Sequence, residues 1–263
     1  WIEEGKKWVC FFQDTNPLIF RCFPALIGVS RKHNLEVNVI GVPRKVGEAA
    51  DVIVDLVKEG EKDKTFLIEW GYADVFFKPH GGEPVKPDGW SHYLTNINGF
   101  CFSLPEYHEH LAKTQGLVAE FINPKYEDET KTKFKSPARL ETKSADYPRL
   151  LESHDRLGIT QVPRLFSFTT CKNDPEEGAK RWNKGIPAEC AGTCEWEYYQ
   201  SNAEILRIAG VQVEKPDETN KTIFAGIEYN FGARVVLKPD FGVTMREIRS
   251  KFTGSIRSVP RRR

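Results

Sequence analysis

The feature that most constrains the fold is the stretch from Trp8 to Asn16, where an apolar, aromatic run ends in four polar residues, Gln13 to Asn16. This pattern is typical of a buried strand of an α/β sheet that delivers polar side chains to a crevice at its carboxyl end. Asp14 would lie at that crevice, where a carboxylate can hold a divalent cation. The same residues also fit a core strand followed by an Asx-rich turn.

The two segments that follow predict how this first strand continues. Residues 17–31 carry a broad apolar face and begin with proline, a combination that favours a helix. Residues 35–42 alternate between apolar and polar side chains and predict a strand. Strand, helix and strand in this order form a βαβ unit, and we therefore expect a parallel sheet at this point of an α/β fold.

The rest of the chain predicts further strands and helices. Residues 51–57 and 65–70 flank a charged loop with a glycine, which predicts a β-hairpin. Helices are expected over residues 105–115, from residue 175 onward and over residues 192–209. Strands are expected over residues 99–104, 164–171 and 211–213.

Charged side chains at the ends of these strands are candidate ligands for phosphate. Arg44 and Lys45 end the second strand, and Lys172 follows the strand expected over residues 164–171. Cations at such positions can contact a phosphate and neutralise its charge. Arg44 and Lys45 fit a solvated turn equally well.

Two amide side chains have the chemistry of a sugar site. Glu69 ends the second strand of the predicted hairpin, and Asn96 and Asn98 open the strand over residues 99–104. Side chains two residues apart on a strand point the same way, and paired amides offer sugar hydroxyls both donors and acceptors. The asparagines also suit a structural turn. Glu69, polar at the tip of its strand, is typical of a half-exposed edge position.

Composition excludes several functional classes. With 38 Lys and Arg against 37 Asp and Glu, the chain has a formal charge of +1, so no global field recruits nucleic acid or a membrane. No signal peptide and no apolar run of membrane-spanning length is present. The six cysteines form no C-x-x-C pair and predict reduced thiols in the cytoplasm. The sequence carries no signal for an oligomeric state.

Seven short motifs, taken in order, resemble one enzyme family. They are Phe11-Phe-Gln-Asp-Thr-Asn16, Val42-Pro-Arg-Lys45, Thr95-Asn-Ile-Asn98, Glu120-Phe-Ile-Asn-Pro-Lys-Tyr126, Phe134-Lys-Ser136 with Arg139-Leu-Glu141, Asp146-Tyr-Pro148 and Lys172-Asn173. Together they resemble the UDP-sugar pyrophosphorylases, or UTP–monosaccharide-1-phosphate uridylyltransferases. The resemblance extends from about Gly5 to about Gly254 and is most specific between Glu120 and Pro148.

The resemblance implies a fold and an activity. The expected fold is α/β, a Rossmann-like nucleotidyltransferase core with a GT-A-like mixed sheet flanked by helices and incomplete at both ends. The expected reaction converts UTP and a monosaccharide 1-phosphate into UDP-sugar and pyrophosphate, with Mg²⁺ (or Mn²⁺) as cofactor. The sugar phosphate oxygen attacks the α-phosphorus of UTP in line, so catalysis depends on positioning and charge neutralisation.

The resemblance also implies roles for single residues. Asp14 would be the metal-binding carboxylate, Lys172 would hold the transferring phosphates, and Lys45 would be a further phosphate contact. The sugar would be bound by a second set of side chains, namely Glu69, Asn96, Asn98 and Glu195.

The ends of the chain predict a fragment. The sequence begins at Trp1 without methionine and reaches a strand within a few residues. We expect residues 1–242 to form part of the catalytic domain, with its sugar-binding part, and residues 243–263 to begin a truncated C-terminal segment. The glycine-rich loop with which the family grips the triphosphate would lie before Trp1.

A second hypothesis is a diverged or truncated relative that binds a UDP-sugar or a partner protein without turnover. Its basis is three departures from the family pattern around the sugar. Glu69 is followed by Trp-Gly rather than Tyr-Asn, Thr95 replaces a glycine, and residues 189–195 read Glu-Cys-Ala-Gly-Thr-Cys-Glu rather than His-Ser-Ala-Thr-Ser-Gly-Glu.

Overall fold

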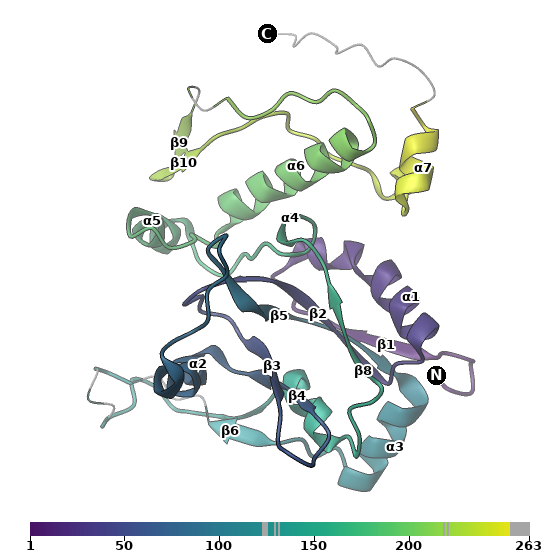
Figure 1. Ribbon diagram of the computed structural model, residues 1–263. Helices are drawn as coiled ribbons and strands as arrows, with labels where there is room; N and C mark the ends of the chain where they lie inside the picture. The colour runs from purple at the N-terminus through teal and green to yellow at the C-terminus, as the bar shows by residue number, and fades with distance from the viewer. Residues whose placement is uncertain (123–125, 129, 131, 218, 220, 253–263) are drawn as a thin grey trace. The chain divides into compact units, whose positions relative to one another are not determined.

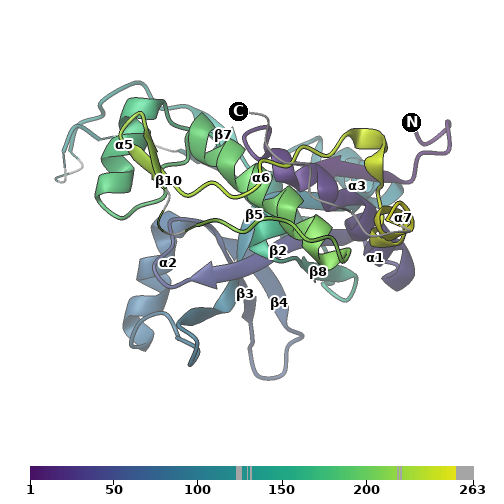
Figure 2. The same ribbon diagram turned by 90° about the horizontal axis from the view of Figure 1, so that it is seen from above.

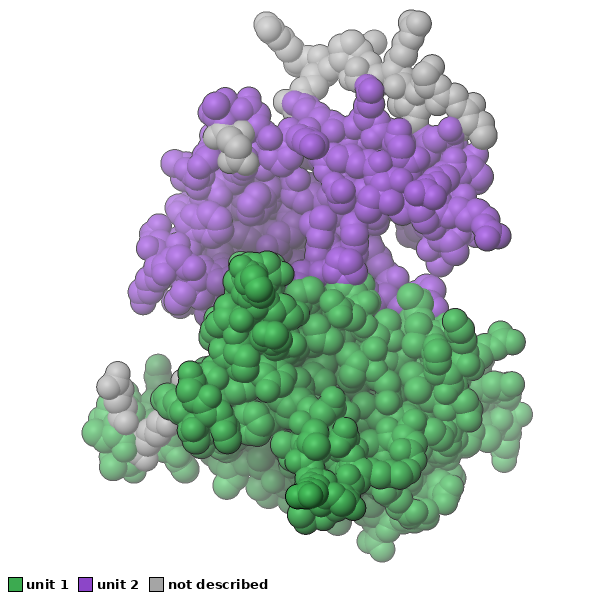
Figure 3. All heavy atoms as spheres, in the orientation of Figure 1, with its two compact units in different colours: residues 1–13, 25–162 green, residues 14–24, 163–263 purple. Residues whose placement is uncertain are grey.

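The structure is a computed structural model that describes residues 1–122, 126–128, 130, 132–217, 219 and 221–252. The chain forms two compact units, shown in green and purple in Figure 3. Unit 1 contains residues 1–13 and 25–162, and unit 2 contains residues 14–24 and 163–263. The domain boundary at residues 242/243 stays a prediction.

Unit 1 is built on a six-stranded mixed sheet with the order β4-β3-β5-β2-β8, in which β1 also pairs with β5 (Figure 1). Its strands are β1 (Trp8–Phe11), β2 (Val37–Lys45), β3 (Val52–Leu56), β4 (Lys64–Ile68), β5 (Trp90–Ser103) and β8 (Leu157–Gln161). Among the described strands of this sheet, β2 and β8 are parallel neighbours, and the other pairs are antiparallel. The predicted mixed sheet flanked by helices is confirmed.

The parallel sheet expected from the opening βαβ pattern is wrong in one respect. β1 and β2 do not pair with each other, because β5 lies between them and runs antiparallel to both. The 14 residues of β5 pair with β2 along one edge and with β3 and β1 along the other. A local pattern of strand, helix and strand carries no information about a third strand that arrives later in the chain.

Helices cover both faces of this sheet (Figures 1 and 2). One face is covered by α1 (Phe23–His33) and α2 (Trp70–Phe77). On that face the amide of Asn38, which is fully buried, donates to the Leu26 carbonyl (3.1 Å) and the Ser30 hydroxyl (3.0 Å) of α1. The other face is covered by α3 (Leu104–Thr114) and the 3-10 helix η3 (Ser144–Leu150).

The largest core cluster of unit 1 lies on the α3 and η3 face. Valines of β2, phenylalanines of β5 and the apolar residues of η3 meet there, among them Val39, Phe102 and Tyr147. Alternation along the strands explains this, since residues 37 and 39 face η3 while Asn38 faces α1. A smaller cluster joins β3 to α2 through Val52, Val54, Ala73 and Phe77.

Two hairpins extend from unit 1. β3 and β4 pair antiparallel from Val52↔Ile68 to Leu56↔Lys64, which confirms the hairpin predicted from the charged loop. β6 (Glu120–Ile122) pairs with β7 (Leu140–Thr142). Residues 123–125 of the most specific motif lie outside the described residues, as do positions 129 and 131 between the two strands. A short 3-10 helix, η2 (Lys78–His80), follows α2.

Unit 2 is mostly helical. It contains η1 (Pro17–Arg21), α4 (Arg164–Ser167), α5 (Pro175–Asn183), α6 (Ala191–Ile208), the hairpin of β9 (Thr222–Phe224) and β10 (Ile227–Tyr229), η4 (Pro239–Phe241) and α7 (Met245–Ser250). Its core cluster joins α5 and α6 to β10 through Tyr229, which stacks on Phe231 and meets Trp196 edge-on. The helices predicted from residue 175 and over residues 192–209 are confirmed, and Asp174 caps α5 by accepting from the Glu177 N–H (2.8 Å).

The two strands predicted for this part of the chain are wrong. Residues 164–167 form a helical turn, and residues 168–171 and 211–213 have no strand partner in the part of the chain that the structure describes. Over residues 164–171, a buried side chain takes hydrogen bonds that a strand would have used. The Asn16 amide donates to the Ser167 carbonyl (2.9 Å) and accepts from the Thr169 N–H (3.2 Å). No helix of the described residues has the length and apolarity needed to cross a membrane.

Candidate functional site

The paired asparagines lie in a bulge of β5. Val39 of β2 faces Phe100 and Gly41 faces Asn96, so three residues of β5 oppose Ile40 alone. Asn98 therefore adopts a left-handed backbone with φ of 54°, which asparagine tolerates better than most residues. The predicted opening of a strand is wrong here, because both asparagines lie inside β5.

The two amides are bonded to each other. The Asn96 side chain accepts from the Asn98 N–H and donates to the Asn98 Oδ1, both at 2.9 Å. Asn96 is only 3% exposed, so this double contact satisfies polar atoms that burial would otherwise leave unpaired. The bulge and the pair of bonds fix both amides in one place, which a regular strand would not require.

Glu69 lies between β4 and α2 and forms an ion pair that the sequence did not predict. Its Oε2 is 2.6 Å from the Nζ of Lys143, which lies between β7 and η3. The Lys143 ammonium also lies 4.4 Å from the centre of the Phe121 ring. Glu69 and Lys143 are about 70 residues apart in the chain, and Phe121 lies on the short strand β6. No pattern of spacing in the sequence indicates that these residues meet.

Asp51 joins Glu69 to the asparagines. Its carbonyl accepts from the Asn96 N–H (2.9 Å), and its Oδ1 accepts from the Trp70 N–H (3.4 Å). Burial raises the pKa of the Asp51 carboxyl, and Glu69 raises it further, although Lys143 and the amide of Asn96 act in the opposite direction. Asp51 precedes β3, and the pairing of Val52 with Thr95 places it beside Asn96.

These five residues, Asp51, Glu69, Asn96, Asn98 and Lys143, form what we call the unit 1 polar cluster. It offers two carboxylates, two amides and one ammonium group. Amides both donate and accept, carboxylates accept, and an ammonium group donates. Such a set suits a ligand with several hydroxyl groups. Three of the five members were predicted from the sequence.

Replacing Asp51 with asparagine should stabilise the protein at neutral pH. A carboxyl whose pKa is raised by folding contributes most to stability when it is protonated, below the ordinary aspartate pKa near 3.8, and loses that contribution as pH rises through its folded value. The neutral Asp51→Asn side chain keeps an acceptor and avoids the cost of a buried charge.

The test is urea denaturation of both proteins across a pH series. We expect the stability gain of Asp51→Asn to be present at pH 7 and to disappear as the pH falls toward 3.8. Asp63→Asn, in the exposed loop after β3, is the matched control and should change stability by less than about 0.5 kcal/mol. A gain that grows on acidification would contradict the raised pKa.

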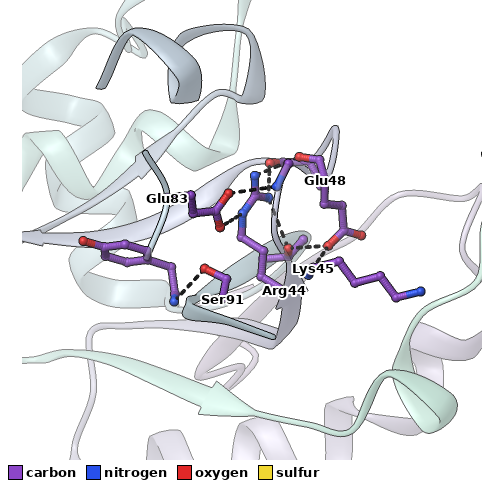
Figure 4. Close-up of polar contacts among 9 residues, drawn as sticks. Arg44, Lys45, Glu48, Glu83 and Ser91 are labelled. Atoms are coloured by element: carbon purple, nitrogen blue, oxygen red, sulfur yellow. Dashed lines mark hydrogen bonds and ion pairs between the residues drawn. The ribbon is translucent and has the colours of Figure 1, made fainter. Parts of the chain in front are cut away.

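The two cations at the end of β2 differ. Arg44 is 1% exposed, so the prediction that it can contact phosphate is wrong. Its guanidinium donates hydrogen bonds to the Glu83 carboxylate and to backbone carbonyls (Figure 4). Lys45 is exposed and extends away from the Arg44 guanidinium, with its Nζ 6.0 Å from the centre of the Trp90 ring. Alternation along the strand separates the two neighbours.

In unit 2, Asp14 and Lys172 are exposed and lie on adjacent segments. The Thr15 carbonyl, one residue after Asp14, accepts from the Cys171 N–H (3.0 Å), one residue before Lys172. The Lys172 and Asn173 N–H groups both donate to the Glu189 carbonyl (2.8 and 2.9 Å). Backbone bonds therefore hold the carboxylate and the lysine on neighbouring segments, although neither residue ends a strand.

Glu195 lies on α6 beside an open pocket of about 430 Å³ in unit 2. Cys171 and Cys194 line this pocket with Tyr198 and Tyr199, and the Tyr199 hydroxyl donates to Glu195 Oε1 (2.5 Å). The pocket thus has an aromatic wall and one carboxylate, and it adjoins the segment that carries Lys172.

Among the described residues, no group of three or more His, Cys, Asp and Glu side chains is placed to hold a metal ion. Of the predicted site residues, Lys45, Glu69, Asn96 and Asn98 lie in unit 1, and Asp14, Lys172 and Glu195 lie in unit 2. The structure groups them within each unit as described, and their roles stay predictions.

The fold is that of the nucleotidyltransferase pyrophosphorylases. The structure matches the crystal structure of a protein assigned as a UDP-N-acetylglucosamine pyrophosphorylase from Entamoeba histolytica, with a TM-score of 0.63 and 17% identity over 97% of this chain and 56% of the other. It also matches UDP-N-acetylglucosamine pyrophosphorylase from Trypanosoma brucei, with a TM-score of 0.56 and 18% identity over 79% of this chain and 38% of the other. At this level of identity the two matches establish the fold alone.

Curated relatives are more similar to this chain in sequence than the two solved structures are. It is 38% identical over 258 residues to UDP-sugar pyrophosphorylase of Arabidopsis thaliana, and 36% identical over 254 residues to UDP-sugar pyrophosphorylase of Oryza sativa subsp. japonica. The resemblance predicted from the seven motifs is confirmed: the chain is homologous to UDP-sugar pyrophosphorylases over at least 95% of its length. It spans 41% of the length of each of these relatives. No protein-family model matches the chain.

Proposed function

We propose that the protein containing this chain is a UTP–monosaccharide-1-phosphate uridylyltransferase, which makes UDP-sugar and pyrophosphate. The observation that carries this proposal is the 38% identity to a UDP-sugar pyrophosphorylase over 97% of the chain. The unit 1 polar cluster supports it, because its amides and carboxylates have the chemistry needed to bind sugar hydroxyls.

In the proposed reaction, an oxygen of the sugar 1-phosphate attacks the α-phosphorus of UTP. A new P–O bond forms, the bond to the pyrophosphate group breaks, and no covalent bond to the protein is made. Catalysis of this kind requires that the reactants be held in line and that phosphate charge be neutralised. Lys172 and Lys45 are the proposed cations, and both are exposed. The unit 1 polar cluster is proposed to position the sugar, and the predicted role of Glu195 as a sugar contact stays a separate proposal.

Asp14 is the proposed ligand for Mg²⁺ or Mn²⁺. Magnesium usually binds through one or two carboxylates together with substrate phosphates, rather than in a cage made by the protein alone. A single exposed carboxylate on a segment bonded to that of Lys172 fits this requirement. When bound, the cation supplies charge neutralisation for the phosphates.

Turnover of the natural protein that contains this chain tests the proposal. Incubation with UTP, glucose 1-phosphate and Mg²⁺ should release pyrophosphate, and the release should depend on all three. Parallel reactions with other monosaccharide 1-phosphates would define the substrate range. Absence of pyrophosphate with every sugar tested would reject the proposal.

A second candidate is a relative that binds UDP-sugar without turnover. The observation that favours it is the set of departures from the family pattern around the sugar, at residues 70–71, 95 and 189–195. This candidate predicts binding of a UDP-sugar in calorimetry without pyrophosphate release. Pyrophosphate release by the natural protein would exclude it.

The proposed partners are UTP and a sugar 1-phosphate, with no nucleic acid and no membrane. The formal charge of +1 supports the absence of a nucleic-acid partner. A cytoplasmic location is proposed because the six cysteines carry free thiols, which persist most readily in a reducing compartment.

A further inference from the structure

Arg44 is a charged side chain in the interior of unit 1. It is 1% exposed, and its Nε lies 2.8 Å from Glu83 Oε1, whose side chain is 6% exposed. Burial of an ion pair removes two charges from water, and the attraction between them often no more than offsets that cost. Stability alone is therefore a weak reason for this pair, and its geometry suggests another.

The guanidinium group of Arg44 binds three further acceptors. Its Nη1 donates to the Ala50 carbonyl (2.7 Å) and, at 3.5 Å, to the Thr95 hydroxyl, and its Nη2 donates to the Glu48 carbonyl (2.8 Å). Figure 4 shows the guanidinium between Glu83 and the loop after β2. One planar fork thus connects the end of β2, the loop over residues 46–50 and the middle of β5.

Three residues of this network lie next to a residue of the proposed site. Arg44 itself precedes Lys45, Ala50 precedes Asp51, and Thr95 precedes Asn96. Asp51 and Asn96 are also joined directly, by the 2.9 Å bond from the Asn96 N–H to the Asp51 carbonyl. A shift of the guanidinium would therefore move the proposed phosphate contact and two members of the unit 1 polar cluster together.

Glu83 holds the same loop from the other side. Its Oε2 accepts from the Gly47 N–H (3.0 Å), and its carboxylate also accepts from Ser91. Burial favours a raised pKa for Glu83, but the bonds from Ser91, Gly47 and Arg44 outweigh it and leave the pKa below the ordinary value. The carboxylate thus stays charged opposite Arg44.

We propose that Arg44, held by Glu83, is a positioning residue for nucleotidyl transfer: it fixes Lys45 and the Asp51–Asn96 pair in the arrangement that receives the sugar 1-phosphate. This inference rests on the proposed function. Lysine in place of Arg44 would keep the charge but lose the planar fork, since a single ammonium group cannot reach the same four acceptors in the same geometry.

A double-mutant cycle between Arg44 and Lys45 tests the proposal in the natural protein. Arg44→Lys should lower kcat/KM for the sugar 1-phosphate by about ten- to a hundredfold, the effect of a small misplacement of a substrate contact. If Arg44 acts through Lys45, Arg44→Lys should have a smaller effect in a Lys45→Ala background, so the two losses should not multiply. Glu83→Gln, which keeps one acceptor oxygen, should also lower kcat/KM, but by a smaller factor. This variant replaces Arg44→Lys in the test if Arg44→Lys does not fold.

Arg156→Lys is the matched control. Arg156 also pairs with a glutamate, Glu106 (2.7 Å), and donates to the Asn34 carbonyl (2.9 Å), but it contacts none of the proposed site residues in the described contacts. We expect Arg156→Lys to leave kcat/KM within about twofold, as for substitutions away from a site. Equal losses for Arg44→Lys and Arg156→Lys, unchanged kcat/KM in folded Arg44→Lys, or losses that multiply in the cycle would overturn the proposal.

Hydrogen exchange separates failure of this inference from failure of the proposed function. If the wild-type protein releases no pyrophosphate, the proposed function is rejected, and exchange still tests Arg44. Arg44→Lys should accelerate exchange of the Gly47 and Asn96 amides, which bond to Glu83 and Asp51, while Arg156→Lys should leave both unchanged. Unchanged protection of these amides in Arg44→Lys would overturn the positioning role.

Discussion

Replacing Lys172 with alanine should reduce pyrophosphate formation by on the order of 10²- to 10³-fold, the usual loss when one group that stabilises transition-state charge is removed. The Lys172 side chain is exposed, and its backbone N–H, which donates to the Glu189 carbonyl, is kept in the variant. We therefore expect thermal unfolding to stay at the wild-type temperature. Initial rates with UTP, glucose 1-phosphate and Mg²⁺ give the measurement.

Lys180→Ala controls for the loss of a positive charge from unit 2. The Lys180 side chain on α5 is 68% exposed, and its Nζ lies 4.0 Å from Glu177 Oε2. We expect Lys180→Ala to leave the rate of pyrophosphate formation unchanged. If Lys172→Ala kept wild-type turnover while the natural protein is active, the proposed phosphate contact would have to be assigned to another cation.

Replacing Phe102 with alanine should destabilise the protein by about 3–5 kcal/mol, as for other large aromatic side chains removed from a packed core. Phe102 lies on β5 and is 1% exposed. The centre of its ring is 4.5 Å from the ring centre of Tyr147, 5.2 Å from that of Phe11 and 5.5 Å from that of Tyr107. The loss would be a large part of the 5–15 kcal/mol that typically stabilises a domain.

Urea denaturation followed by circular dichroism measures this loss. Tyr72→Ala is the control, because Tyr72 is an aromatic residue of unit 1 that is 64% exposed on α2. We expect the control to change the free energy of unfolding by less than about 0.5 kcal/mol. A similar small change for Phe102→Ala would mean that this cluster does not carry the stability of unit 1.

Much of the fold was predictable from local patterns. The β3–β4 hairpin followed from two β-rich runs around a charged loop, and α6 followed from helical spacing that ended at glycine. Each of these signals comes from residues near one another in the chain. The seven motifs were also local, and their order along the chain led to the relationship that sequence identity confirms.

The strand predicted over residues 164–171 failed for a physical reason. A β-rich run becomes a strand only when another strand accepts its hydrogen bonds, and the buried Asn16 amide takes those of Ser167 and Thr169. Asn16 is 151 residues before Ser167, so local sequence carries no trace of this contact.

In the candidate site, too, local sequence predicted some residues, whereas others depend on contacts between distant segments. Residue type identified Asn96, Asn98, Asp14 and Lys172, because carboxylates, amides and lysines have the chemistry that sugars and phosphates require, and the family resemblance added Glu69. The partners Asp51 and Lys143 were missed, since nothing in their own surroundings distinguishes them from ordinary surface charges.

The sequence by itself determined which chemical groups this protein carries, most of its helices and its relationship to the UDP-sugar pyrophosphorylases. Only the tertiary structure decided that Lys143 pairs with Glu69, that β5 separates β1 from β2, and that Arg44 is buried while Lys45 is exposed. The physical reason is that these properties depend on strand pairing and burial between distant segments, and such contacts form only when the chain folds around β5.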